Sequence, residues 1–395
     1  MFNSVSLTKK SLILIGTLTT AHMINDFYAH VLPFVIPALI QDLKISYFEA
    51  GMLALAISIF SGVLSPFLGQ MGDRHAWRKR IMIFGFLAFC LGLLIMGLSA
   101  NYALILVACF IFGLGEFTFH PQSTNFLTRN FPGTKGKVMG IHGIGGSIGN
   151  FTAPLVVTFL ITLVGWRESL FYLTIPGLLT IFALKMVLKE PPKAKKQALF
   201  GGITLPLLLL TVNFAMIQMV YKGFLIFLPT FLIESGSTMQ SAGAISALML
   251  FTGLFTQPLG GILMDKLGGR VVFIGSSITS AIALWLFTVS SGVFVVITIL
   301  MFGAAIYALF PVALAMASQV VRSDHVGMSV GLVFGIGSTF SAFTPMLTGL
   351  AADRIGLQAS FQYLIVFPVL ALIVALFLPS KQKLASAIGN PEPAG

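Results

Sequence analysis

Mostly apolar stretches of about 20 residues or more, with very few charges inside them, recur along the whole chain. A helix needs roughly 20 such residues to cross the hydrocarbon of a bilayer. Strands of a membrane barrel alternate apolar and polar residues, whereas the stretch from Ile81 to Leu98 is apolar on every side. The pattern therefore predicts an all-α membrane protein with twelve transmembrane helices. The predicted spans are 11–39, 47–70, 81–99, 102–127, 138–163, 169–188, 203–233, 241–263, 271–289, 293–319, 327–350 and 358–379.

The composition agrees with lipid as the main solvent of this chain. Of its 395 residues 57% are hydrophobic and 9% are charged, against about 25% charged residues in a soluble domain. The net charge of +11 does not indicate a nucleic-acid partner, because the basic residues are spread over many loops. Cys90 and Cys109 both lie in apolar spans and are read as small apolar side chains, not as a disulfide or metal pair. We expect no cofactor and no bound metal.

Lysine and arginine distribution predicts the orientation of the spans. If both termini are cytoplasmic, nineteen of these residues fall on the cytoplasmic side. Only Lys44, Arg167 and Arg354 fall on the other side. Cytoplasmic loops of membrane proteins carry the excess of positive charge. The split therefore predicts cytoplasmic N- and C-termini.

The chain repeats itself at an offset of about 190 residues. The repeat predicts an N-terminal six-helix bundle (1–188), a cytoplasmic linker (189–202) and a C-terminal six-helix bundle with a short tail (203–395). Parallel six-helix repeats are found in secondary transporters, whose substrate site lies between the halves. The recurring residues are Pro66, Gly69 and Asp73 with Pro258, Gly261 and Asp265; Phe112, Gly113 and Pro121 with Phe302, Gly303 and Pro311; and Gly140, Gly146 and Pro154 with Gly331, Gly337 and Pro345.

Two loops at equivalent places in the repeat carry similar motifs, one from Gly69 to Arg80 and one from Gly261 to Arg270. Both resemble the G-x-x-x-D-R/K-x-G-R/K signature of the major facilitator superfamily. The first copy departs from the signature at Ala76 and Trp77, where a glycine is usual. The resemblance implies the two-bundle fold, alternating access and a latch made by these loops; the alternative is that their charges only anchor the loops. We expect a monomer in the bilayer of the cytoplasmic (inner) membrane of a bacterium or archaeon. The motif residues predicted to act in gating are Gly69, Asp73, Arg74, Arg78, Asp265, Lys266 and Arg270.

Two shorter motifs lie in the first and fourth spans: H-x-x-N-D, from His22 to Asp26, and F-H-P-x-S, from Phe119 to Ser123. Together they resemble the fosmidomycin-resistance branch of drug exporters. This resemblance implies export of a small organic molecule by proton antiport. The segment from Gly140 to Pro154 partly matches the antiporter pattern of proton-driven exporters, although its glycines and proline are also explained by close packing and a kink.

Ionisable residues inside the spans are few, and each costs about 2.5–3.5 kcal/mol on insertion scales. The acids are Asp26 and Glu116, and the base is Lys222. His22 precedes Asp26 by four residues and His120 follows Glu116 by four, so each pair shares a helix face. We predict that Asp26 and Glu116 exchange protons, with His22 and His120 beside them; the alternative is a fixed network with Lys222.

The resembled fold implies a central cavity lined by spans one, four, seven and ten. Polar residues of these spans are therefore candidates for contact with the substrate. They are Asn25, His30, Asn213, Gln218, Lys222 and Tyr307.

These features together predict a secondary active transporter, in first place a proton-coupled exporter of a drug-like compound or metabolite. Import of a small nutrient by proton symport is the nearest alternative, and a metal or siderophore transporter is a weaker one. An enzyme is not expected, because the chain has no H-E-x-x-H motif.

Overall fold

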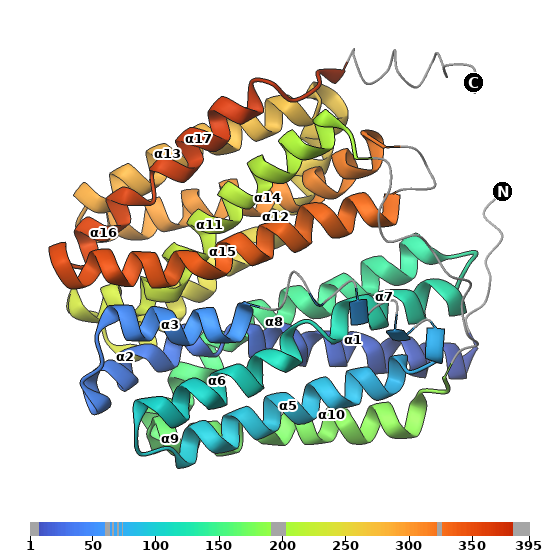
Figure 1. Cartoon of the computed structure of the whole chain (residues 1–395), viewed down its shortest axis with the longest axis horizontal. Coiled ribbons are helices and arrows are strands. Elements are labelled where there is room, and N and C mark those ends of the chain that lie inside the picture. Colours follow the sequence, from blue (N-terminus) through green and yellow to red (C-terminus); the bar gives the residue numbers. More distant parts are fainter. Residues whose placement is uncertain are drawn as a thin grey trace. The chain divides into compact units, whose positions relative to one another are not determined.

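All regular elements in the described part of the chain are helices (Figure 1). The computed structural model describes residues 8–59, 64, 67–68, 71–72, 74–190, 203–321 and 326–381. The helices are α1 (Lys9–Ala29), α2 (Leu32–Leu43), α3 (Tyr47–Ser58), α5 (Arg78–Leu98), α6 (Tyr102–Glu116), α7 (Phe119–Asn130), α8 (Lys135–Val164), α9 (Trp166–Tyr172), α10 (Thr174–Val187), α11 (Leu205–Glu234), α12 (Met239–Leu267), α13 (Gly269–Val289), α14 (Val293–Gln319), α15 (Val326–Ile355), α16 (Leu357–Tyr363) and α17 (Val366–Ala375).

The helices confirm the predicted all-α membrane fold. Within the described residues, 11 helices are long and apolar enough to cross a bilayer. The helix Tyr47–Ser58 is a shorter apolar one, and the rest of the predicted span 47–70 falls largely on residues outside the description. The first span is divided into α1 and α2 at His30 and Val31.

The described contacts divide the chain into two compact units. Unit 1 contains residues 1–38 and 56–197, and unit 2 contains 39–55 and 198–395. Most of the predicted linker, residues 191–202, lies outside the described residues.

Helix packing within each unit follows the repeat seen in the sequence. In unit 1, α1 packs on α8, and α5 packs on α6 and α10. In unit 2, α11 packs on α15, and α13 packs on α14 and α17. The contact of α1 with α8 is close because Gly149 has no side chain: a Cβ there would lie 2.1 Å from the Met23 carbonyl oxygen. Small residues allow such backbone approach in membrane helices.

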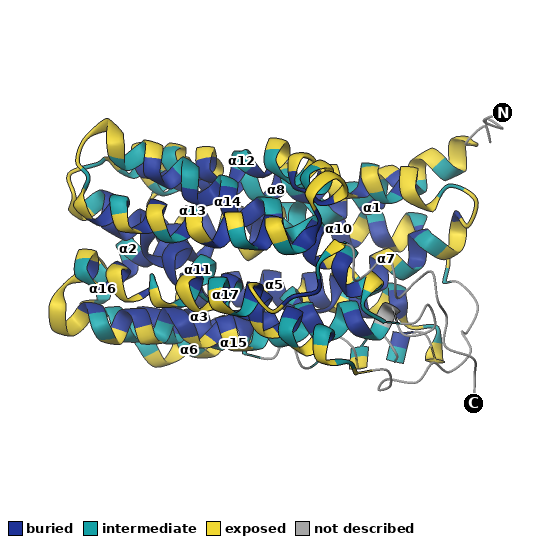
Figure 2. Cartoon of the chain, turned by 90° about the horizontal axis from the view of Figure 1, so that it is seen from above, coloured by how far each residue is buried: buried dark blue, intermediate teal, exposed yellow. Residues whose placement is uncertain are grey.

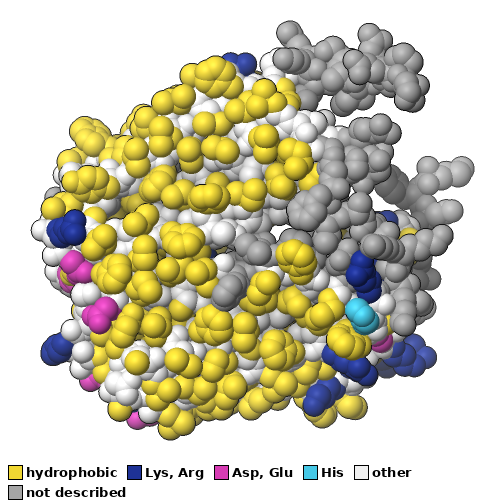
Figure 3. All heavy atoms as spheres, in the orientation of Figure 1, with side chains coloured by type: hydrophobic (Ala, Val, Ile, Leu, Met, Phe, Trp, Pro, Cys, Tyr) yellow, Lys and Arg dark blue, Asp and Glu magenta, His cyan; other side chains and the backbone are white. Residues whose placement is uncertain are grey.

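Exposed residues occur along both units (Figure 2), and many of them are large and apolar. Leu98, Leu179 and Trp285 are exposed by 74%, 64% and 56%. On the face drawn in Figure 3, apolar side chains cover the middle and charged ones gather toward the two ends. Such a surface suits contact with lipid chains along the helices and with water at their ends.

The start of α3 is held within unit 2 by two acidic side chains. The Asp353 carboxylate accepts hydrogen bonds from the backbone N–H groups of Tyr47 and Phe48, both at 2.9 Å. The Tyr47 hydroxyl donates to Glu234 at 2.6 Å. Asp353 thus satisfies N–H groups that the first turn of a helix leaves without intrahelical partners.

Candidate functional site

A polar cluster in unit 1 is built around the carboxylate of Asp26 on α1. His22 Nε2 lies 3.4 Å from Asp26 Oδ2, one helical turn away. His120 Nε2, on α7, lies 3.4 Å from Asp26 Oδ1. One carboxylate therefore faces two imidazoles, one on each of its oxygens. Three of the four residues predicted to take part in proton exchange, His22, Asp26 and His120, thus lie close together.

Hydrogen bonds around the cluster restrict where its protons lie. His22 Nδ1 is 2.8 Å from the backbone carbonyl oxygen of His142, which can only accept, so this nitrogen carries a hydrogen. If Asp26 were ionised and His22 neutral, the Nε2 lone pair would face a carboxylate oxygen. The arrangement therefore favours one additional proton held by the pair, on His22 or on Asp26.

His120 has a choice of partners. Asn25 Nδ2 donates to Asp26 Oδ1 at 3.1 Å and lies 3.2 Å from His120 Nε2. A neutral His120 accepts from Asn25 through that nitrogen, whereas a protonated His120 pairs with Asp26. The same three side chains can thus hold the cluster together with or without a proton on His120.

The members of the cluster differ in exposure. The side chains of His22 and Asp26 are 12% and 16% exposed, and that of His120 is 52% exposed. His120 is therefore the most exposed of the three. The ligand atoms of His22, Asp26 and His120 all lie within 4.8 Å of one another, a set of imidazole and carboxylate donors that also suits a transition-metal ion.

A glycine on α8 makes room for the pair on α1. A Cβ added to Gly146 would lie 2.6 Å from Asp26 Oδ2 and 2.8 Å from His22 Nε2. Both distances are too short for any real Cβ atom. Gly146 therefore lets α8 pack directly over the two ionisable groups.

The predicted coupling residue Glu116 lies at the end of α6. Its carboxylate accepts a hydrogen bond from Ser58 at 3.3 Å and is close enough to His120 for their charges to interact. His30 follows the end of α1, where its Nδ1 lies 3.0 Å from the backbone carbonyl oxygen of Asp26. His30 is thus joined to the cluster through the backbone of Asp26.

The polar candidates of unit 2 differ in burial and in the partners of their polar atoms. Asn213 is fully buried and donates to the backbone carbonyl oxygen of Ala371 on α17. Gln218 Oε1 is buried without a hydrogen-bond partner. The Tyr307 hydroxyl lies 2.7 Å from that of Tyr221. Lys222 is half-buried one turn after Gln218.

The predicted gating residues have different surroundings. Gly69 and Asp73 lie outside the described residues. Arg78 is fully buried, with its Nη1 3.9 Å from Glu190 Oε1. The three gating candidates of unit 2, Asp265, Lys266 and Arg270, lie where α12 ends and α13 begins. There the ammonium of Lys381 donates hydrogen bonds to the backbone carbonyl oxygens of Asp265 and Lys266. Arg74 is exposed, and Arg270 is half-buried.

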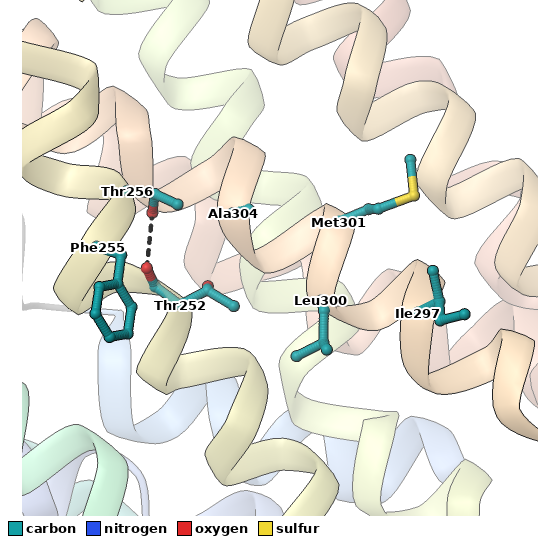
Figure 4. A pocket seen from close by; sticks show the side chains of 7 residues that line it. All are labelled: Thr252, Phe255, Thr256, Ile297, Leu300, Met301 and Ala304. Atoms are coloured by element: carbon teal, nitrogen blue, oxygen red, sulfur yellow. Dashed lines mark hydrogen bonds between the residues drawn. The ribbon is translucent and has the colours of Figure 1, made fainter. Parts of the chain in front are cut away.

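An apolar pocket of about 410 Å³ lies between α12 and α14 in unit 2 (Figure 4). Its two polar residues are threonines, and the Thr256 hydroxyl donates to the backbone of Thr252. No ionisable side chain is among the described residues that line it.

Sequence reasoning gave His142 and Phe119 too little weight. The His142 ring is buried and stacks on His22 with centroids 4.2 Å apart, and its Nε2 lies 3.3 Å from the Ser123 hydroxyl. Phe119 stacks on the same His22 ring at 5.9 Å. The F-H-P-x-S motif was the available signal, because three of its residues meet α1 or α8 in this cluster.

Among known proteins, the chain is similar to the fosmidomycin resistance protein of Escherichia coli (strain K12). The two are 22% identical over 392 residues, which cover 96% of each. In fold it matches a bacterial homologue of the human lysosomal transporter Spinster, with a TM-score of 0.80, 18% identity and coverage of 98% of this chain and 100% of that one. It also matches a D-xylose–proton symporter, with a TM-score of 0.77, 15% identity and coverage of 93% and 97%.

The sequence model that describes the Major Facilitator Superfamily matches residues 18–256 and 210–393. These two matches cover nearly the whole chain. Together with the helical fold and the repeat, they show that this multi-pass membrane protein belongs to the Major Facilitator Superfamily of transporters.

Proposed function

We propose that this transporter is a proton-coupled exporter that exchanges protons for a small drug-like compound or metabolite. The observation that carries the proposal is the Asp26 carboxylate, held within 3.4 Å of His22 and of His120 in a span. Buried ionisable groups in spans are costly and are retained where they serve transport. Carboxylate and imidazole groups change charge when they take up protons, as a coupling site requires.

In the proposed mechanism a proton enters through His120, the exposed member of the cluster. Protonated His120 turns from Asn25 to Asp26, and Asp26 shares the incoming proton with His22. Loss of the negative charge on Asp26 removes its attraction for the two imidazoles. Protonation thereby changes the contacts between α1 and α7, which is the differential interaction that a switch between two transporter states needs. Glu116 acts on His120 through its charge.

Substrate contacts are proposed for polar residues of both units. In unit 1 these are Asn25 and His30. In unit 2, Gln218 is the strongest candidate, because its buried Oε1 lacks a hydrogen-bond partner and an unsatisfied acceptor is costly unless a ligand satisfies it. Lys222 and Tyr307 follow it, and Asn213 is the weakest candidate, since its side chain is bound to the backbone of Ala371.

Export is favoured over import by the motifs around His22 and His120 and by similarity to a fosmidomycin resistance protein. Proton symport of a nutrient is the alternative, consistent with the fold shared with a D-xylose–proton symporter. A divalent metal as cargo is a second candidate, favoured by the donor atoms of His22, Asp26 and His120. We expect no enzymatic activity.

We further propose a monomer in the bacterial or archaeal inner membrane, with both termini cytoplasmic and with the two signature loops acting as a cytoplasmic latch. Engineered cysteines at Lys193 and Arg167 test the orientation, because membrane-impermeant reagents should label them from opposite sides. Labelling of both from one side contradicts it. Replacing Asp73 by asparagine should impair transport without blocking insertion; normal turnover would reduce the loop to an anchor.

The coupling proposal is tested in proteoliposomes with an imposed pH gradient, screened across organic cations, anions, sugars and divalent metals. Antiport predicts accumulation of an organic compound on the side that is more acidic, because protons leave that side as the compound enters it. Accumulation on the more alkaline side identifies a symporter. Transport that ignores the gradient, or that is restricted to metal ions, contradicts the proposal.

A further inference from the structure

A second site lies at the membrane-surface end of unit 1, away from the polar cluster. A cavity of about 460 Å³ opens where α5 begins and α10 ends. Its walls include the basic residues Lys79, Arg80 and Lys189, together with Ile83, Leu188 and Glu190. The site thus combines three cations, one acid and apolar carbon surface.

The acid in this cavity is already compensated. Glu190 Oε1 accepts the backbone N–H of Arg78 at 2.7 Å, and Oε2 accepts that of Lys79 at 2.9 Å. The guanidinium of Arg78 lies 3.9 Å from the same carboxylate. Glu190 therefore caps the N-terminus of α5, where a negative charge is favoured. The cavity keeps a positive character.

The three cations have different tasks. The ammonium of Lys79 donates to the carbonyl oxygens of Lys185 and Leu188, at 2.7 and 2.8 Å, and so caps the C-terminal end of α10. Arg80 and Lys189 are exposed at the rim. They are the two charges most available to an anion.

Each exposed cation stands at the end of an exposed apolar stripe. On α5, Phe84, Leu87 and Leu91 follow Arg80 at helical spacing on one face. On α10, the exposed side chains of Met186, Phe182, Leu179 and Ile175 lead toward Lys189 in the same way. α5 and α10 pack on each other, so both stripes run from this cavity along the membrane-crossing part of unit 1.

We propose that this cavity binds the phosphate headgroup of an anionic phospholipid, whose acyl chains lie along the stripes of α5 and α10. The exposed guanidinium and ammonium complement a phosphate, and the apolar side chains complement hydrocarbon. A free phosphate or a soluble anion would use only the first of these features. The occupant that matches both is a lipid of the surrounding bilayer.

The test is lipid binding to the purified full-length protein, followed by native mass spectrometry. Phosphatidylglycerol is compared with phosphatidylcholine of the same chains and with glycerol phosphate, which lacks chains. The test variant is Arg80→Gln/Lys189→Gln. The matched control is Lys135→Gln/Lys137→Gln, which removes two exposed charges from the start of α8. A charge-conserving variant, Arg80→Lys/Lys189→Arg, shows whether loss of binding follows charge instead of misfolding.

Wild type, the matched control and the charge-conserving variant should all prefer phosphatidylglycerol. The test variant should lose roughly 30-fold in affinity for it, as expected from about 1 kcal/mol for each basic residue near an anionic surface. Equal losses in test and control variants would overturn the proposal, since they would indicate a diffuse surface effect. Equal binding of phosphatidylcholine, or competition by glycerol phosphate at the same concentration as the lipid, would overturn it as well.

Discussion

The ring clusters of the two units occupy equivalent places but contain different chemistry. In unit 1, His22 on α1 meets His120 edge-on, at 5.1 Å and 84°, and stacks on His142. In unit 2, Phe214 on α11 meets Phe310 edge-on, at 5.7 Å and 88°. His22 lies against Gly146 of α8, and Phe214 lies against Gly337 of α15, which is the equivalent glycine in the repeat. The repeat has kept the packing of rings and changed their polarity.

The acid shows the same contrast. The side chain one turn after His22 is Asp26, and the one after Phe214 is Gln218, and each again lies near the equivalent glycine. Gln218 can donate and accept hydrogen bonds but cannot change its charge. Phe310 and Phe334, whose rings contact Phe214, have no polar atoms in their side chains and cannot bind a proton. We infer that, of these two equivalent places, the one in unit 1 exchanges protons and the one in unit 2 serves binding and packing.

The largest expected effect comes from replacing the imidazole of His120 in unit 1 by the phenyl ring that Phe310 has at the equivalent place in unit 2. His120→Phe keeps an edge-on ring beside His22 and removes the entry group for protons. Gradient-driven accumulation should fall by roughly two orders of magnitude, the size of effect typical of a lost proton-transfer group. The measurement is substrate uptake into proteoliposomes driven by an imposed pH gradient.

The matched control is Phe310→His, the reverse change in unit 2. It should leave the coupling of protons to substrate intact, because no carboxylate stands one turn from Phe214. Equal losses of coupling in both variants would remove the distinction between the units.

A smaller effect should come from the two glycines. A Cβ on Gly146 would press on Asp26 and His22 at 2.6 and 2.8 Å, whereas one on Gly337 would lie 3.2 Å from the nearest atom of Phe214. Gly146→Ala should therefore slow coupled transport by about tenfold, the equivalent of about 1.4 kcal/mol and within the usual range for overpacking. Initial rates at equal protein in the membrane give the measurement. The comparison fails if Gly337→Ala is the more damaging of the two.

The smallest effect concerns the signature turns. Ala76 has a φ of +56° where the second unit has Gly268 with a φ of +89°. Positive φ strains a residue that has a Cβ, so Ala76→Gly should stabilise the protein by up to about 1 kcal/mol. Gly268→Ala should act in the opposite direction. Thermal unfolding in detergent distinguishes them; a lowered midpoint for Ala76→Gly would show that the turn is not strained.

Sequence patterns predicted the helices well, because crossing lipid requires long apolar stretches whatever their neighbours are. The spacing of four residues also predicted correctly that His22 and Asp26 lie side by side on one helix face. The partnership of Asp26 with His120 and the position of His142 depend on how α1, α7 and α8 pack. Helical spacing carries no information on that packing, so the sequence paired His120 with Glu116 and gave no sign of its contact with Asp26.

Proton movement coupled to substrate in liposomes containing Asp26→Asn is the most direct test of the central claim. The amide keeps the shape of the carboxylate but does not take up a proton in the pH range in which a carboxylate does. We predict that substrate no longer drives proton movement, while substrate binding and counterflow without a gradient persist. Gln218→Leu in unit 2 should show the reverse, with weaker binding and a normal ratio of protons to substrate. A wild-type ratio in Asp26→Asn, alone and combined with Glu116→Gln, would contradict the account.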